Sequence, residues 1–100
     1  MKAKLLYREK ITDEDGDLRE MVLWAVSHSN KYPGGVRYRM AFIPHGAKEP
    51  SVLYDNHHPK GHHKHIRGKE EPYHFLNSHQ LLVDFEKDIE LWKRSRRKFP

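Results

Sequence analysis

The sequence contains no cysteine, so disulfide bridges and thiolate metal sites are excluded. It also lacks any apolar run near the ~18 residues that cross a bilayer, and its start, MKAKLLYREK, becomes charged too early for a secretory signal. We therefore expect a cytoplasmic protein that does not contact a membrane. Acidic residues are outnumbered, with 14 Asp and Glu against 19 Lys and Arg, which gives a formal net charge of +5. This balance favours an anionic partner, and the charge alone fits nucleic acid, an acidic protein or a membrane surface.

The length of 100 residues suits one hydrophobic core. Hydrophobic residues make up 36% and charged residues 33%, which is polar for a globular protein, but 11% aromatic residues exceed what a disordered chain usually carries. We therefore expect a single domain over residues 1–100 with a modest core.

The first half has the residue pattern of an antiparallel meander. Residues 4–11 alternate as in a strand, and DEDGD at 13–17 is a turn signal whose Asp15-Gly16 pair suits a tight hairpin. Residues 18–26 are apolar on both faces toward their end, which predicts a central strand. Residues 36–43 and 51–55 predict two further strands. The meander is therefore expected over residues 1–56.

An amphipathic helix is predicted over residues 77–97. Apolar residues recur there at three- and four-residue steps, at Leu81, Leu82, Phe85, Ile89 and Trp92. Asn77 is placed to cap the helix, and Gln80 three residues later completes a capping pattern. The predicted fold class is α+β: an antiparallel sheet of four or five strands with this long C-terminal helix packed on it.

Residues 54–75, YDNHHPKGHHKHIRGKEEPYHF, hold six of the nine histidines. Few of these positions could enter an apolar core, so we interpret the segment as a His-rich loop. His63 and His65 are one residue apart, and in an extended backbone both imidazoles would leave the same face roughly 6.6 Å apart. This spacing is compatible with two kinds of chemistry.

In the first kind, one histidine removes a proton from a nucleophile and the other donates a proton to a leaving group. Cleavage of RNA through its 2′-hydroxyl needs these groups and a nearby cation, which Lys60, Lys64 or Arg67 would supply, but no metal or other cofactor. In the second kind, the two histidines are metal ligands, and a third ligand comes from His57, His58, His62 or Asp55. The H-x-H spacing is short enough to occur by chance in a His-rich loop, so solvated histidines without a specific role are a third interpretation.

The neighbouring residues also have two interpretations. Asp55 is at a strand exit, where it either makes a turn or orients an imidazole. A glutamate of the EEPY segment would serve as a second acid or base, and Tyr73 offers a proton or a ring on which a base stacks, unless this segment is an ordinary polar loop. The KRSRRK run at 93–98 holds more cations than the helix dipole requires, so we expect the surplus to bind an anion.

The chain resembles the TumE family of toxin proteins. The resemblance rests on YDN-x₃-KG-x-H-x-H followed by EEPY-x-F, together with the opening MKAKLLYREKI, the EMVLW strand and the LLVDFEKDIE helix. It covers nearly the whole chain in the expected order. The sequence departs from the family at His62, where an acidic residue usually precedes the first of the two spaced histidines.

The resemblance implies a small toxin of a type II toxin–antitoxin pair, held inactive by a helix-turn-helix antitoxin. We expect it to stop growth by cleaving RNA, either free or on the ribosome, and to form a homodimer or a hetero-oligomer with the antitoxin. The expected catalytic residues are His63, His65, Lys60, Asp55, Glu71 and Tyr73. The expected substrate-binding residues are Arg67, Tyr54, Asn56, Lys64, Arg96 and Arg97. The alternatives are an inhibitor that binds RNA or a ribosome without chemistry, and a metal-dependent nuclease or nucleotidyl-transferring toxin.

Overall fold

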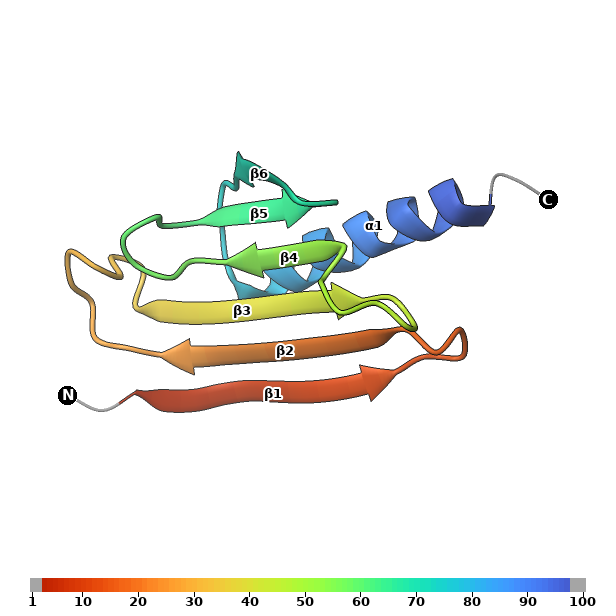
Figure 1. Cartoon of the computed structure of the whole chain (residues 1–100). Coiled ribbons are helices and arrows are strands. Elements are labelled where there is room, and N and C mark those ends of the chain that lie inside the picture. The colour runs from red at the N-terminus through yellow and green to blue at the C-terminus, as the bar shows by residue number, and fades with distance from the viewer. Residues whose placement is uncertain (1–2, 98–100) are drawn as a thin grey trace.

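The computed structural model describes residues 3–97, apart from the side chain of Arg97. Six antiparallel strands form one sheet in the order of the sequence, β1-β2-β3-β4-β5-β6 (Figure 1). Their bounds are β1 Lys4–Thr12, β2 Leu18–Ala25, β3 Val36–Ile43, β4 Val52–Asp55, β5 His63–Ile66 and β6 Lys69–Pro72. A single helix, α1, covers Ser78–Arg97. The α+β class, the meander and the C-terminal helix are therefore confirmed.

The expected count of four or five strands is corrected to six, because the segment interpreted as a loop contains β5 and β6. Arg67 and Gly68 join these strands with φ angles of +52° and +82°. Positive φ at both central residues is the mark of the two-residue hairpin turn whose twist matches that of the strands it connects. The hairpin was not predicted, because KEEP consists of Lys, Glu and Pro, which are depleted in strands, and HKHI has a single apolar residue.

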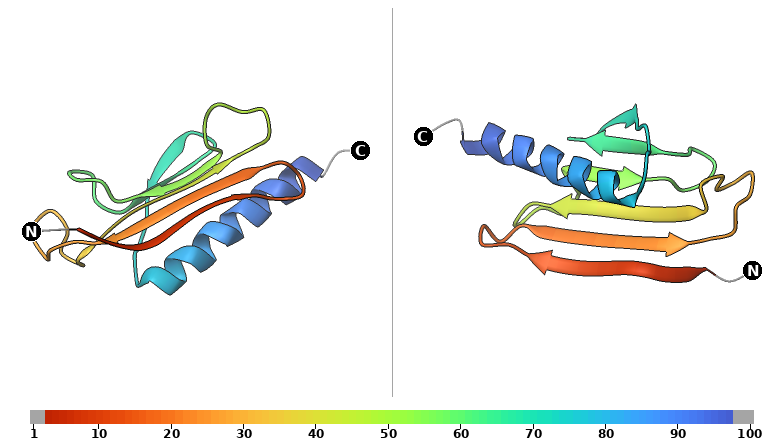
Figure 2. Two further views of the ribbon diagram at one scale, coloured as in Figure 1. Left: turned by 90° about the horizontal axis from the view of Figure 1, so that it is seen from below. Right: turned by 180° about the vertical axis from the view of Figure 1, so that it is seen from behind.

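Helix α1 packs along one face of the sheet (Figure 2). Its buried stripe is Leu81, Phe85 and Ile89, each at most 1% exposed. Asn77 caps the helix, since its Oδ1 accepts a hydrogen bond of 2.8 Å from the backbone amide of Gln80. Within residues 3–97, no helix is long and apolar enough to cross a membrane.

The two faces of the sheet differ in what covers them. Side chains alternate along each strand, and directly opposed residues of neighbouring strands share a face. The face toward α1 carries the core, including Met40, Phe42, Val52 and Tyr54. We call the opposite face the open face, because no helix or strand of residues 3–97 lies on it (Figure 2). Its residues include Arg8, Lys10, Glu20, Val22, Trp24, Arg37, Arg39, Leu53, Asp55, His63, His65 and Glu70.

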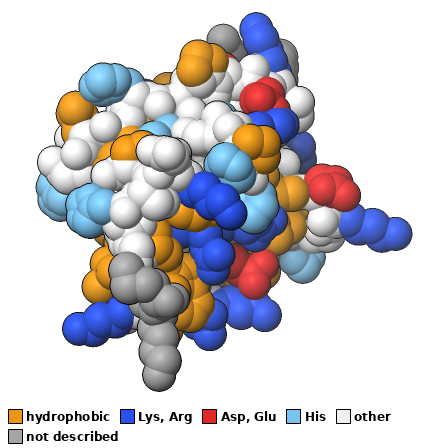
Figure 3. Space-filling view, turned by 90° about the vertical axis from the view of Figure 1, so that its left-hand side faces the viewer, with side chains coloured by type: hydrophobic (Ala, Val, Ile, Leu, Met, Phe, Trp, Pro, Cys, Tyr) orange, Lys and Arg blue, Asp and Glu red, His pale blue; other side chains and the backbone are white. Residues whose placement is uncertain are grey.

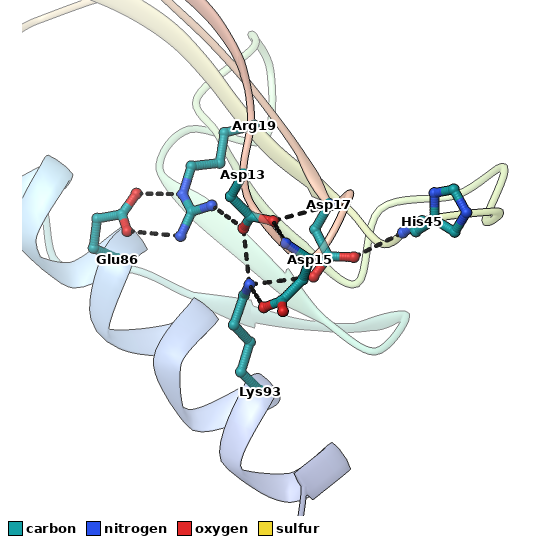
Figure 4. A network of polar contacts seen from close by, with 7 residues as sticks. All are labelled: Asp13, Asp15, Asp17, Arg19, His45, Glu86 and Lys93. Carbon is teal, nitrogen blue, oxygen red and sulfur yellow. Dashed lines mark hydrogen bonds and ion pairs between the residues drawn. The ribbon is translucent and has the colours of Figure 1, made fainter.

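An ion-pair cluster fastens the C-terminal half of α1 to the β1–β2 turn (Figure 4). The Nζ of Lys93 lies 2.8 Å from a carboxylate oxygen of Asp13, 2.6 Å from Asp15 and 3.3 Å from Asp17. Arg19 joins Asp13, at 2.7 Å, to Glu86 on the helix, at 2.8 Å. Lys93 therefore has a structural role and is not part of the surplus of cations expected at the end of the helix.

Candidate active site

The residues expected in the active site lie on both faces of the sheet. Asp55, opposite His63 in the register of β4 and β5, lies on the open face, and so does His65. Tyr54 and Lys64 are also opposite each other, but they point toward α1. The structure therefore brings together two separate groups, because neighbours in a strand point to opposite faces.

The histidine pair lies at the β5 end of the open face. The ring centroids of His63 and His65 are 5.1 Å apart, with the rings nearly perpendicular. The Nδ1 of His63 is 2.8 Å from the carbonyl oxygen of Gly61. A carbonyl only accepts, so Nδ1 carries a hydrogen and the Nε2 of the neutral ring is left with its lone pair. His63 is 7% exposed, whereas the side chain of His65 is 27% exposed. The extended geometry expected for this H-x-H segment is confirmed.

Glu70 and Lys60 complete this group. The Oε1 of Glu70 lies 3.7 Å from the Nε2 of His65 and 2.6 Å from the Nζ of Lys60. The hydrogen bond from Lys60 is the main cause that lowers the pKa of Glu70. Glu71, the glutamate expected in the site, lies on the other face with its Oε1 3.9 Å from the Nζ of Lys64. A two-residue turn at 67–68 places Ile66 opposite Lys69 and therefore His65 opposite Glu70. Recognising that turn in the sequence would have selected Glu70 as the neighbour of His65.

Asp55 and Asn56 hold the chain where β4 ends. The Oδ1 of Asp55 accepts a hydrogen bond of 2.6 Å from the amide of His57, which is the turn chemistry considered in the sequence. The buried side chain of Asn56 accepts from the amide of Tyr38 at 2.8 Å and donates to the carbonyl of Val36 at 2.9 Å. Asn56 thus joins the β4–β5 loop to the backbone of β3.

A second group of expected site residues forms a polar network between the sheet and α1. The hydroxyl of Tyr54 donates to Asp88, and the Nζ of Lys64 lies 3.0 Å from the same carboxylate. The hydroxyl of Tyr73 donates to Asp84 at 2.5 Å. The ring of Tyr54 is fully buried, and the structure therefore places it in the core and not on a surface where a base could stack.

The ionisation of this network follows from its burial. Burial is the largest cause that raises the pKa of Tyr54, and the hydrogen bond to Asp88 adds to it. Burial and the hydrogen bond to Asp84 raise the pKa of Tyr73 in the same way. Both tyrosines stay protonated at neutral pH and act as hydrogen-bond donors to carboxylates. The network therefore fixes β4 and β5 against α1, and with them the histidines on the reverse side of β5.

His62, where the sequence departs from the family pattern, packs on the α1 side. Its ring stacks on Phe75, at 4.7 Å between centroids, and on Tyr38, whose hydroxyl is 2.9 Å from its Nδ1. Burial lowers the pKa of His62. His57 and His58 are exposed. Figure 3 views the molecule from the end that carries the β4–β5 loop and shows histidine side chains there, with lysine and arginine side chains among them.

Among residues 3–97, one group of three side chains has ligand atoms close enough to share a metal ion. It consists of Asp13, Asp15 and Asp17, with ligand atoms within 4.8 Å of one another. The ammonium group of Lys93 contacts all three, so a cation already lies among these carboxylates. The histidines proposed as ligands do not form such a group in the described part of the chain.

The expected substrate-binding arginines lie at the other end of β5. A cavity of about 670 Å³ is lined by Pro44, His45, Gly46, Ala47, Ser51, Arg67, Trp92, Ser95 and Arg96. Arg67 donates to the Oγ of Ser95 at 2.5 Å, and the guanidinium of Arg96 lies 5.2 Å from the ring centroid of Trp92. Arg67 is four residues from His63, about 13 Å along a strand. The side chain of Arg97 and the whole of Lys98 lie outside the described residues.

Comparison with known proteins agrees with the motif analysis. No curated protein and no solved structure shows significant similarity to the chain. The family model described as Toxin TumE matches residues 2–93, which is more than nine-tenths of the chain. The chain therefore belongs to the TumE toxin family.

Proposed function

We propose that this toxin inhibits growth by cleaving RNA without a metal ion, and that a helix-turn-helix antitoxin of a type II pair restrains it. The observation that supports the proposal is the histidine pair, which lies on the open face beside Lys60 and Glu70. A general base, a general acid and a cation are the groups that 2′-hydroxyl attack on phosphate requires.

His63 is the proposed base, because the hydrogen on Nδ1 leaves Nε2 as the acceptor in the neutral ring. It takes the proton of a 2′-hydroxyl while that oxygen bonds to the adjacent phosphorus. The bond from phosphorus to the 5′-oxygen breaks, and His65 donates a proton to that oxygen. Glu70 lies where its carboxylate forms an ion pair with the imidazolium form of His65. The products are a 2′,3′-cyclic phosphate end and a 5′-hydroxyl end.

A non-catalytic inhibitor is the second candidate, and the burial of His63 favours it. With 7% of its surface exposed, His63 offers a substrate little area, and one ring nitrogen is already bonded to Gly61. In this candidate the histidines hold the β4–β5 loop, and the basic open face blocks RNA or a ribosome by binding alone.

Product analysis distinguishes the two candidates. The purified chain should cleave single-stranded RNA in the presence of EDTA and leave 2′,3′-cyclic phosphate ends. His63→Ala and His65→Ala should each abolish cleavage and relieve growth arrest, whereas His28→Ala, at an exposed position between β2 and β3, should remain active and toxic. Thermal unfolding of each variant separates loss of chemistry from loss of the fold. If the chain is toxic without cleaving RNA, and His63→Ala and His65→Ala are equally toxic, the non-catalytic inhibitor is the correct candidate.

A further inference from the structure

A row of opposed residues crosses the open face from β1 to the histidine pair. In the strand register Arg8 is opposite Val22, Val22 opposite Arg39, Arg39 opposite Asp55, and Asp55 opposite His63. Neighbouring strands are about 4.8 Å apart, so Arg39 lies about 10 Å and Arg8 about 19 Å from His63 along the sheet. The row therefore links the basic part of the sheet to the proposed catalytic pair over the length of a few nucleotides.

Trp24 lies beside this row on the open face, close to Arg8, Arg37 and Arg39. The guanidinium of Arg8 lies 5.7 Å from the Trp24 ring centroid, and Arg37 is opposite Trp24 in the register. A hollow of about 240 Å³ beside them is lined by Val22, Trp24, Arg37, Tyr38, Arg39, Asp55 and His57. Trp24 is half-buried, so part of its surface is open to a ligand.

Ion pairs distinguish these arginines from other arginines in the described part of the chain. Among residues 3–97, no carboxylate forms an ion pair with Arg8, Arg37 or Arg39. By contrast, Arg19 and Arg94 are both paired with glutamates. Asp55 lines the hollow with Arg37 and Arg39, so one carboxylate faces two guanidinium groups there, and an anionic ligand would offset the remaining positive charge.

We propose that a single strand of RNA binds across the open face, with a base stacked on Trp24 and its phosphates held by Arg37 and Arg39, so that the adjoining nucleotides reach His63 and His65. The choice of RNA rests on the proposed function. A single strand is required because a base must leave its own stack to cover an indole ring, and duplex RNA keeps its bases stacked. Aromatic rings on an exposed sheet, flanked by cations that follow the backbone, bind single strands with little sequence preference.

The two tryptophans provide matched reporters, since the chain has no others. Trp92→Phe leaves Trp24 as the only tryptophan, and Trp24→Phe leaves Trp92, which lines the cavity near the C-terminal end of α1. The ligand is a short 2′-O-methyl RNA, which has no free 2′-hydroxyl and so cannot be cleaved by the proposed reaction. We expect this RNA to quench the fluorescence of Trp24 and to leave that of Trp92 unchanged.

Affinity gives a second, independent measurement. Trp24→Ala should weaken binding of the same RNA by about 5- to 150-fold, the range of a lost base–aromatic stack. Arg37→Gln combined with Arg39→Gln should lower the slope of log K against log salt by about 1.4, or about 0.7 for each lost phosphate contact. Lys87→Gln is the control, because Lys87 is exposed on α1, which covers the other face of the sheet, and lies outside the run of cations at 93–98. It should leave both the affinity and the slope unchanged.

The outcomes separate this proposal from the proposed function. Quenching of Trp92 and not Trp24 would place RNA in the cavity near the end of α1 and overturn the inference, even if RNA is cleaved. Bound RNA that quenches neither reporter would overturn it as well. Quenching of Trp24 by an acidic segment of the antitoxin, without any by RNA, would assign the open face to a protein partner. Quenching of Trp24 by RNA without cleavage of an unmodified strand would support the RNA surface and refute only the chemistry.

Discussion

The substitution Lys93→Met tests whether the cluster at the β1–β2 turn holds α1 in place. Lys93 is 8% exposed, and its ammonium group contacts Asp13, Asp15 and Asp17. Methionine has a similar unbranched shape and keeps the packing of the side-chain stem, so the main loss is the charge. We expect the free energy of unfolding to fall because three carboxylates remain close together without their cation.

The size of the loss follows from how far these carboxylates are removed from water. The side chains of Asp13 and Asp17 are 19% and 10% exposed, whereas that of Asp15 is 50% exposed. Removing one partner of a buried ion pair costs about 3–5 kcal/mol. Arg19 still neutralises Asp13 in the variant, and Asp15 can turn to solvent, so we expect the low end, about 3 kcal/mol. For a domain of this size that loss lowers Tm by about 15 °C.

The pH dependence of this loss of stability shows whether its cause is electrostatic. Burial raises the pKa of Asp13, but hydrogen bonds from Lys93 and Arg19 outweigh it, and the pKa of the folded state lies below the usual range. A carboxyl whose pKa is lowered by folding contributes stability above its unfolded pKa, about 3.9, and loses this contribution as pH falls below it. The difference in stability between wild type and Lys93→Met should therefore be full at pH 7 and should shrink below about pH 4.

Urea unfolding followed by circular dichroism measures this difference at each pH. Lys87→Met is the matched control, since Lys87 is exposed on the same helix, and it should change stability by less than about 0.5 kcal/mol. Adding Asp15→Asn to Lys93→Met should recover part of the loss, because fewer like charges remain. A loss below about 1 kcal/mol, or a loss that stays constant down to pH 3, would refute an electrostatic role for Lys93.

Three further predictions concern pH, the ribosome and the antitoxin. Burial lowers the pKa of His62, so the unfolded state binds more protons than the folded state below about pH 6.5, and the free energy of unfolding should fall from pH 7 to pH 5. In urea titrations, His62→Gln should reduce this pH dependence of stability, and an unchanged pH dependence would assign it to other groups. Replacing Arg96, Arg97 and Lys98 with Gln should weaken binding to the ribosome and reduce the salt dependence of that binding; an unchanged salt slope would mean that the run of cations at 93–98 is a solvated helix end. An antitoxin that covers residues 55–73 should slow hydrogen exchange there and bind more weakly as salt rises; protection of residues 85–92 alone would indicate inhibition from a distance.

Local patterns in the sequence were enough for much of the fold and for the family. The helix was predictable because Leu81, Phe85 and Ile89 recur at the helical period and Asn77 caps the first turn. The hairpin at 13–17 was predictable because Gly16, with φ of +83°, provides the backbone angle that the turn needs. The shared face of His63 and His65 was predictable from their spacing, because alternation along a strand depends only on neighbouring residues. The anionic partner that the net charge favours stays a prediction.

The tertiary structure alone decided which site residues meet. A strand has a period of two, so the turn at Arg67 and Gly68 sets whether Glu70 or Glu71 lies beside His65, and a shift of one residue would exchange them. The hydroxyl of Tyr54 donates to Asp88, which is 34 positions away in the chain. The open face exists because one helix covers only one side of a six-stranded sheet. Contacts between residues so far apart are set by packing and register, and no local pattern of residues encodes them.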